Sequence, residues 1–146
     1  MNFLAIDYGS RRIGLAHGDS ELGIAMPVPA ATEPDFEQRV AHIGREIRER
    51  RIGTLVVGYP VNMDGSHGFK TKEVDEFIAL LESRFSLPVE RTDETLSSYE
   101  AESGISAKRK GGRDARSRKK FRQSGEIDSR AAAVFLQDFL NAKFGF

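Results

Sequence analysis

Acidic side chains stand at three points along the chain where the hydrophobic pattern predicts the end of a strand or the start of a helix. Asp7 ends the apolar run of residues 3–7, the pair Asp93 and Glu94 follows "LPVERT", and Asp128 opens the last amphipathic segment. Mg²⁺ and Mn²⁺ prefer carboxylate and water oxygens, and two such ions can stabilise the attacking water and the leaving oxygen in phosphodiester cleavage. These residue types therefore suit metal-dependent phosphodiester hydrolysis if the fold brings them together.

Asp7 alternates with Phe3 and Ala5, so the three side chains share one face of the predicted strand. An ionised carboxylate on a buried face is costly unless it is paired, hydrogen-bonded or bound to a metal ion. The other interpretation is a turn aspartate that accepts backbone N–H bonds from the following "YGS". For Asp7 taken alone, both interpretations stay open.

Asp93 and Glu94 are neighbours, so on an extended backbone they point to opposite faces and at most one readily joins Asp7. We choose Glu94 as the second carboxylate and keep Asp93 as a candidate additional acid. A solvated strand end, or a helix cap formed by Asp93 or Thr95, is the structural alternative.

Asp128 lies at helical offsets from Ala131, Ala132 and Phe135, which puts it on the apolar stripe of the last helix and directs it at the sheet. An N-cap would also explain an aspartate at this position, because capping favours that residue type. Three carboxylates at two strand ends and one helix start would repel one another unless divalent cations neutralised them.

Positive charge is concentrated in residues 108–122, "KRKGGRDARSRKKFR", which hold nine basic residues and one acid. The segment carries +8, and because the whole chain has a formal net charge of zero, the rest carries −8. Lys and Arg contacts to phosphates supply the sequence-independent part of nucleic-acid affinity, whereas the alternative is a solvated loop without a ligand. We predict a flexible basic loop that binds nucleic acid through Lys108, Arg109, Lys110, Arg113, Arg116, Arg118, Lys119, Lys120 and Arg122.

The elements that must position these side chains follow from hydrophobic periodicity. Strands are expected over 3–7, 13–16, 22–26, 54–58 and 87–92, with helices within 34–53, around 74–85 and over 128–144. The order predicts an α/β fold in which helices cover both faces of a mixed five-stranded sheet, within a single domain of residues 1–146. Residues 54–58 are apolar without alternation, which is typical of a strand covered on both faces.

Several classes of protein are excluded or disfavoured by composition. The chain has no cysteine, so disulfides and thiolate metal sites are excluded, and the three histidines show no paired spacing. No apolar run approaches the roughly 20 residues that span a bilayer, and the N-terminus lacks the pattern of a signal peptide. We therefore expect a cytoplasmic protein without a membrane partner.

Four sequence blocks, in the same order and at about the same spacing, resemble the YqgF family, also called RuvX. They are "AIDYGSRRIGLA", "VVGYPVNMDG", "TDETLSSYEA" and "IDSRAAAVFLQDFL". The family is associated with nuclease activity on pre-16S rRNA and with Holliday junction resolution, and belongs to the ribonuclease H-like superfamily. The resemblance therefore implies a ribonuclease H-like fold and an endonuclease acting on structured RNA or branched DNA.

The same resemblance assigns roles to individual residues. It makes Asp7, Glu94 and Asp128 the catalytic carboxylates and the ligands of Mg²⁺ or Mn²⁺. Thr95 stands where family members often have an arginine, which weakens any role for a basic group there and leaves the carboxylates unaffected. The loop residues expected to shape the site are Gly9, Asn62 and Gly65.

Maturation of the 5′ end of pre-16S rRNA is the leading expectation, with the pre-ribosomal small subunit as a partner and the protein a monomer or weak homodimer. Three alternatives stay open: a Holliday junction resolvase, a noncatalytic RNA-binding assembly factor, and an ATPase domain. The last arises because "DYGSRRIGLA" is also similar to the first phosphate loop of actin-like kinases. That class builds its cleft between two related domains, however, and this chain shows no internal repeat.

Overall fold

A computed structural model of the protein describes residues 1–60, 69–93 and 125–145. In chain order the elements are β1 (Asn2–Asp7), β2 (Ile13–Asp19), β3 (Ile24–Ala31), α1 (Phe36–Glu49), β4 (Thr54–Tyr59), α2 (Phe69–Phe85), β5 (Val89–Asp93) and α5 (Glu126–Phe144). The candidate residues Asn62, Gly65, Glu94 and 108–122 lie outside the described residues. None of the described helices is long and apolar enough to cross a membrane.

The strands form one mixed sheet in the order β3-β2-β1-β4-β5, which confirms the predicted five-stranded sheet. The first three strands pair as an antiparallel meander, whereas β4 and β5 run parallel to β1. The carboxyl ends of the parallel strands β1, β4 and β5 therefore meet at one edge of the sheet, and Asp7 is the last residue of β1.

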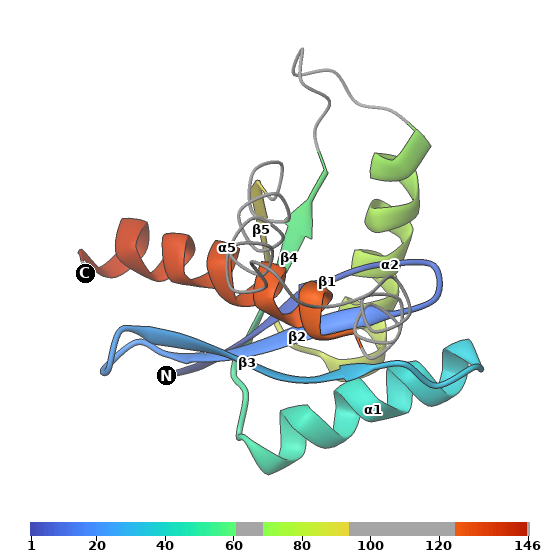
Figure 1. Ribbon diagram of the computed structural model, residues 1–146, viewed down its shortest axis with the longest axis horizontal. Coiled ribbons are helices and arrows are strands. Elements are labelled where there is room, and N and C mark those ends of the chain that lie inside the picture. The colour runs from blue at the N-terminus through green and yellow to red at the C-terminus, as the bar shows by residue number, and fades with distance from the viewer. Residues whose placement is uncertain (61–68, 94–124, 146) are drawn as a thin grey trace, which may run out of the picture.

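Helices cover both faces of the sheet, as the sequence predicted (Figure 1). The apolar side chains of α1 and α2 pack with Leu4, Ile6 and Val57 on one face. On the other face α5 packs with Phe3, Ala5 and Val56. Strand β4 contributes to both clusters because it lies between β1 and β5 with a helix layer on each side, which is why its sequence does not alternate.

The predicted bounds of the third strand were wrong. Residues 22–26 were expected to form it, with "PVP" as its end, but β3 begins at Ile24 and continues through both prolines to Ala31. Proline lacks a backbone N–H and is tolerated on an edge strand, where one side of the backbone has no partner in the sheet. Strand β3 is such an edge, so Pro27 and Pro29 do not end it.

Small residues on β2 allow α5 to lie close to the sheet. Gly14, Ala16 and Gly18 pair with Asp7, Ala5 and Phe3 of β1, so they share the face that α5 covers. A Cβ atom added to Gly18 would lie 2.9 Å from Leu136 Cδ2, which is closer than two carbon atoms pack. The helix therefore packs directly on the backbone of β2, and its first turn comes to the edge where β1 ends.

Candidate active site

Asp7 occupies the last position of β1, half-buried on the face of the sheet that α5 covers. Its backbone pairs with Gly14 of the antiparallel neighbour β2. Phe3 and Ala5, two and four residues earlier, pack in the cluster beneath α5, and strand alternation puts Asp7 on the same face. The carboxylate thus lies at the rim of an apolar core rather than in open solvent.

Asp128, near the other end of the chain, lies at the same edge of the sheet as Asp7. A Cβ atom on Gly14 would lie 2.2 Å from the carbonyl carbon and oxygen of Asp128 and 2.7 Å from its Cβ. Asp128 therefore lies directly over Gly14, the residue that pairs with Asp7. Paired residues of antiparallel strands have Cα atoms about 4.5–5.5 Å apart, so the two carboxylates extend from adjacent backbone positions.

The helix α5 begins two residues before Asp128, with Gly125 as its N-cap residue. The interpretation of Asp128 as the N-cap is therefore wrong, whereas its predicted orientation toward the sheet is confirmed by the contact with Gly14. An acidic side chain in the first turn also interacts favourably with the positive end of the helix dipole.

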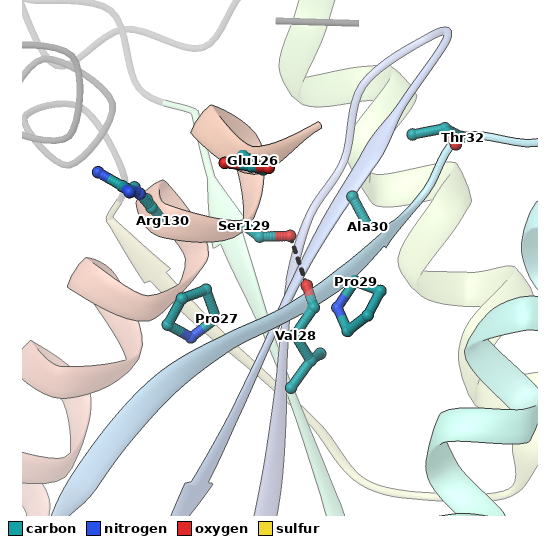
Figure 2. A pocket seen from close by; sticks show the side chains of 8 residues that line it. All are labelled: Pro27, Val28, Pro29, Ala30, Thr32, Glu126, Ser129 and Arg130. Carbon is teal, nitrogen blue, oxygen red and sulfur yellow. Dashed lines mark hydrogen bonds between the residues drawn. The ribbon is translucent and has the colours of Figure 1, made fainter. Parts of the chain in front are cut away.

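Ser129 anchors this first turn to the sheet through a hydroxyl that bridges two strands. Its Oγ accepts a hydrogen bond from the N–H of Leu15 at 3.1 Å. The same hydroxyl donates to the carbonyl of Val28 at 2.8 Å, the contact drawn in Figure 2. The register between β2 and β3 shifts at this point, between Ile13 and Leu15. The Ser129 hydroxyl therefore provides a hydrogen-bond partner for backbone groups beside the irregularity, the Leu15 N–H and the Val28 carbonyl. Ser129 is only 3% exposed, so the position of its neighbour Asp128 is set by a buried contact.

Arg12 forms the one ion pair that Asp128 makes within the described part of the chain. Its Nε lies 3.0 Å from Asp128 Oδ2, with both side chains partly exposed. Arg12 belongs to the turn of residues 8–12 that joins β1 to β2. In the same turn a Cβ atom on Gly9 would lie 2.5 Å from the carbonyl oxygen of Arg12, so only glycine fits there without a backbone shift.

A pocket of about 480 Å³ opens beside this ion pair, and we name it the turn pocket. Residues from the turn, from α2 and from α5 line it: Tyr8, Gly9, Ser10, Arg11, Arg12, Glu73 and Asp128. Burial and the nearby carboxylate of Glu73 raise the pKa of the Tyr8 hydroxyl, and Arg39 opposes them. Tyr8 is therefore neutral at physiological pH and can donate a hydrogen bond into the pocket.

A second pocket, of about 620 Å³, lies between edge strand β3 and the first turn of α5 (Figure 2). Its wall is formed by Pro27, Pro29 and Ala30 from the strand, with Ser129 and Arg130 from the helix. Glu126 is the one acid in its lining, whereas the turn pocket is lined by two acids, Glu73 and Asp128.

Asp93 lies at the same edge of the sheet as Asp7, but on the opposite face. It pairs in register with Tyr59 of β4, whose ring packs with the core beneath α1 and α2 and whose hydroxyl donates to Asp75 of α2 at 3.0 Å. Residues in register on parallel strands share a face, so Asp93 lies on the α2 side and Asp7 on the α5 side. The structure thus brings Asp7 and Asp128 together but does not add Asp93 to them.

The donor set suits a hard divalent cation. Within residues 1–60, 69–93 and 125–145, no three His, Asp or Glu side chains group closely enough to hold a metal ion. Asp7 and Asp128 supply carboxylate oxygens on one face, and oxygen ligands are those that Mg²⁺ and Mn²⁺ prefer. The two described carboxylates fit such an ion as part of its ligand set.

Sequence reasoning missed Gly14, Arg12 and Ser129 as parts of the site. The alternation of Gly14, Ala16 and Gly18 was the available signal, because small residues at every second position of a strand indicate close approach of another element. No local pattern distinguishes Ser129 from a solvent-exposed serine, since its partners lie in β2 and β3.

The chain matches a known protein family, and individual proteins are similar to it over almost its whole length. The family described as "RuvX: Holliday junction resolvase" matches residues 1–142. A protein of Opitutus terrae named "Putative pre-16S rRNA nuclease" is 47% identical over 145 residues, covering 99% of this chain and 94% of its own. A protein of the same name from Anaeromyxobacter sp. is 39% identical, with 98% of each chain covered.

Two solved structures share the fold at low sequence identity. The resolvase of fowlpox virus, in complex with Holliday junction DNA, has a TM-score of 0.56 at 11% identity and covers 96% of this chain and 99% of its own. RuvC of T. thermophilus, in complex with a Holliday junction substrate, has a TM-score of 0.54 at 15% identity, covering 99% and 96%. The likeness confirms the predicted ribonuclease H-like fold.

Proposed function

Because the chain belongs to the RuvX family, we propose that it is a divalent-metal-dependent endonuclease that matures the 5′ end of pre-16S rRNA. The observation that carries the proposal is the contact of Asp128 with Gly14, because Gly14 pairs with Asp7 and the two carboxylates thereby extend from adjacent positions. The name of the relatives at 47% and 39% identity supports pre-16S rRNA as the substrate. The pre-ribosomal small subunit is then the natural partner.

Asp7, Glu94 and Asp128 would hold Mg²⁺ or Mn²⁺, which supplies Lewis acidity and an activated water when bound. Glu94 lies outside the described residues, and it is favoured over Asp93 because Asp93 shares the face of Tyr59, opposite Asp7. Three carboxylates require no Ser, His or Cys nucleophile, in agreement with the absence of cysteine.

The chain's own residues have separate tasks in this reaction. Ser129 holds the first turn of α5 on the sheet, which keeps Asp128 over Gly14. Gly9 permits the turn that leads from Asp7 into β2. The basic segment 108–122, which lies outside the described residues, would bind the phosphate backbone on either side of the cleaved bond.

The test is cleavage of a pre-16S rRNA fragment by the purified protein in Mg²⁺ or Mn²⁺. We expect Asp7→Asn and Asp128→Asn each to lower the rate more than about 100-fold, since loss of even an outer partner of a metal ligand costs about 10–100-fold. Asp138→Asn is the matched control, because Asp138 is an exposed aspartate on the same helix. Cleavage that survives Asp7→Asn would refute the assignment.

Holliday junction resolution is the second candidate function, favoured by the family's description and by the two structurally similar resolvases, which are bound to junction DNA. A four-way DNA junction offered beside the RNA fragment separates the two. Resolution of a two-fold symmetric junction also favours a dimer, so sedimentation with and without the junction is informative. Salt-sensitive RNA binding without cleavage would instead identify a noncatalytic assembly factor, and ATP hydrolysis without nucleic acid would favour the ATPase alternative.

A further inference from the structure

Arg12 holds the same carboxylate that we assign to the metal site. Its Nε donates to Asp128 Oδ2 at 3.0 Å, across the contact between the turn of residues 8–12 and the first turn of α5. A divalent cation bound by Asp128 would need this oxygen or its immediate surroundings. The guanidinium and the cation therefore compete for one carboxylate.

We propose that Arg12 pairs with Asp128 only until a divalent cation takes that carboxylate, and that Arg12 then binds a phosphate of the nucleic-acid substrate in the turn pocket. The inference rests on the proposed function, because it takes Asp128 as a metal ligand. The inference goes beyond that function in one respect: Arg12 binds a substrate phosphate only when a metal ion is bound at Asp128.

The ion pair is of a kind that can be exchanged. The side chain of Arg12 is 35% exposed and that of Asp128 28% exposed, so water screens their attraction and either partner is accessible to a competitor. A divalent cation carries twice the charge of the guanidinium and binds carboxylate oxygen directly, without an intervening donor hydrogen. The ion pair of Arg12 with Asp128 is thus weak enough for a divalent cation to replace it.

The turn pocket provides a place for the released guanidinium to bind a phosphate. It has a volume of about 480 Å³, and its lining includes the bases Arg11 and Arg12 and the acids Glu73 and Asp128. Once a cation neutralises Asp128, the two arginines outweigh the single remaining carboxylate. The planar guanidinium fork matches two phosphate oxygens, which makes arginine well suited to this task.

The backbone of the turn is held in place while the side chain changes partner. Arg39 of α1 is 7% exposed, and its Nη2 donates to the carbonyl of Ser10 at 3.4 Å. Gly9 packs against the carbonyl of Arg12, as described above. The exchange therefore requires rotation of one side chain and no movement of the strands.

Arg11 is a matched control. It has the same charge, lines the same pocket, and forms no ion pair or hydrogen bond with the rest of the described chain. If Arg12 acts only through its positive charge, substitutions of Arg11 and of Arg12 will change the metal affinity equally. If Arg12 competes with the metal ion, only its substitution will change metal affinity strongly.

The first experiment is calorimetric titration of the full-length protein with MnCl₂ in the absence of nucleic acid. We expect Arg12→Gln to tighten Mn²⁺ binding about fivefold, equivalent to about 1 kcal/mol and comparable to a partly exposed ion pair. Arg11→Gln should change it less than about twofold, and Arg12→Lys should return it toward the wild-type value. Unchanged or weaker Mn²⁺ binding by Arg12→Gln would overturn the proposal, as would a wild-type protein that binds no Mn²⁺.

The second experiment measures binding of a labelled RNA hairpin by fluorescence anisotropy, in EDTA and in Mn²⁺, with the RNA shown to be intact after each titration. Arg12→Gln should weaken binding about fivefold in Mn²⁺ and less than about twofold in EDTA. Arg11→Gln should have the same effect in both conditions. An effect of Arg12→Gln that does not depend on Mn²⁺ would also overturn the proposal.

These measurements separate the inference from the function on which it rests. If the wild-type protein binds Mn²⁺ but cleaves neither RNA nor junction DNA, the proposed activity fails while the exchange of Arg12 can still be observed. If it cleaves and Arg12→Gln leaves Mn²⁺ affinity unchanged, the exchange fails while the activity stands.

Discussion

Substitution of Gly14 by alanine should displace Asp128 from Asp7. The added Cβ would lie 2.2 Å from the carbonyl carbon and oxygen of Asp128, whereas real Cβ atoms essentially never approach other heavy atoms closer than 3.0 Å. The atoms in the way belong to the backbone of α5, so no side-chain rotation can relieve the overlap. The first turn of the helix must therefore move away from β2 by about 1 Å, the scale at which a misplaced group affects catalysis.

Two quantities follow from this displacement. Overpacking of a tight contact costs about 1–3 kcal/mol, so the unfolding free energy should fall by that amount. A misplacement of about 1 Å between reacting groups costs about 100-fold in rate, so cleavage should fall much more than stability does. The buried bridge from Ser129 to Leu15 and Val28 opposes the shift and concentrates the strain at Asp128.

Urea unfolding and single-turnover cleavage measure the two effects separately. Gly53→Ala is the control, because a Cβ atom there meets nothing within 4 Å. It should leave cleavage unchanged and stability within about 1 kcal/mol of the wild type. A Gly14→Ala protein that folds and cleaves like the wild type would show that the position of α5 over β2 does not set the site.

Three further predictions concern other parts of the molecule. Ser129→Ala should lower the unfolding free energy by about 1–3 kcal/mol, because the Leu15 N–H and the Val28 carbonyl lose their partner. Ser20→Ala should have little effect, because the Ser20 hydroxyl accepts an exposed hydrogen bond from the N-terminal ammonium. Burial and the charge of Arg50 lower the pKa of His17, so the unfolded chain binds the proton more readily. Stability should then fall as the pH drops below about 6.5, and His17→Gln should reduce this loss in urea titrations at several pH values. Neutralising several basic residues within 108–122 should flatten the slope of log K against log[salt] by about 0.9 for each lost duplex phosphate contact, or about 0.7 on single strands, and an unchanged slope would remove the segment from the binding surface.

Strand alternation was sufficient to predict which face Asp7 occupies, and helical spacing was sufficient to direct Asp128 at the sheet. Both predictions rest on neighbours within a few residues, and the packing of Phe3, Ala5 and Ala132 in one cluster confirms the faces. The end of β3 was predicted wrongly, because proline ends a central strand but not an edge strand. Whether a strand is at the edge depends on the order of the whole sheet.

The sequence by itself determined the elements, their buried faces and the residue types available for metal chemistry, because these follow from periodicity and side-chain chemistry over short distances. Only the tertiary structure decided which carboxylates meet. Leu15 and Ser129, which join β2 to α5, are 114 residues apart, and the approach of the two elements depends on the missing side chain of Gly14. Packing across such a distance is a property of the folded chain, and it brings Asp128 over Gly14, beside Asp7.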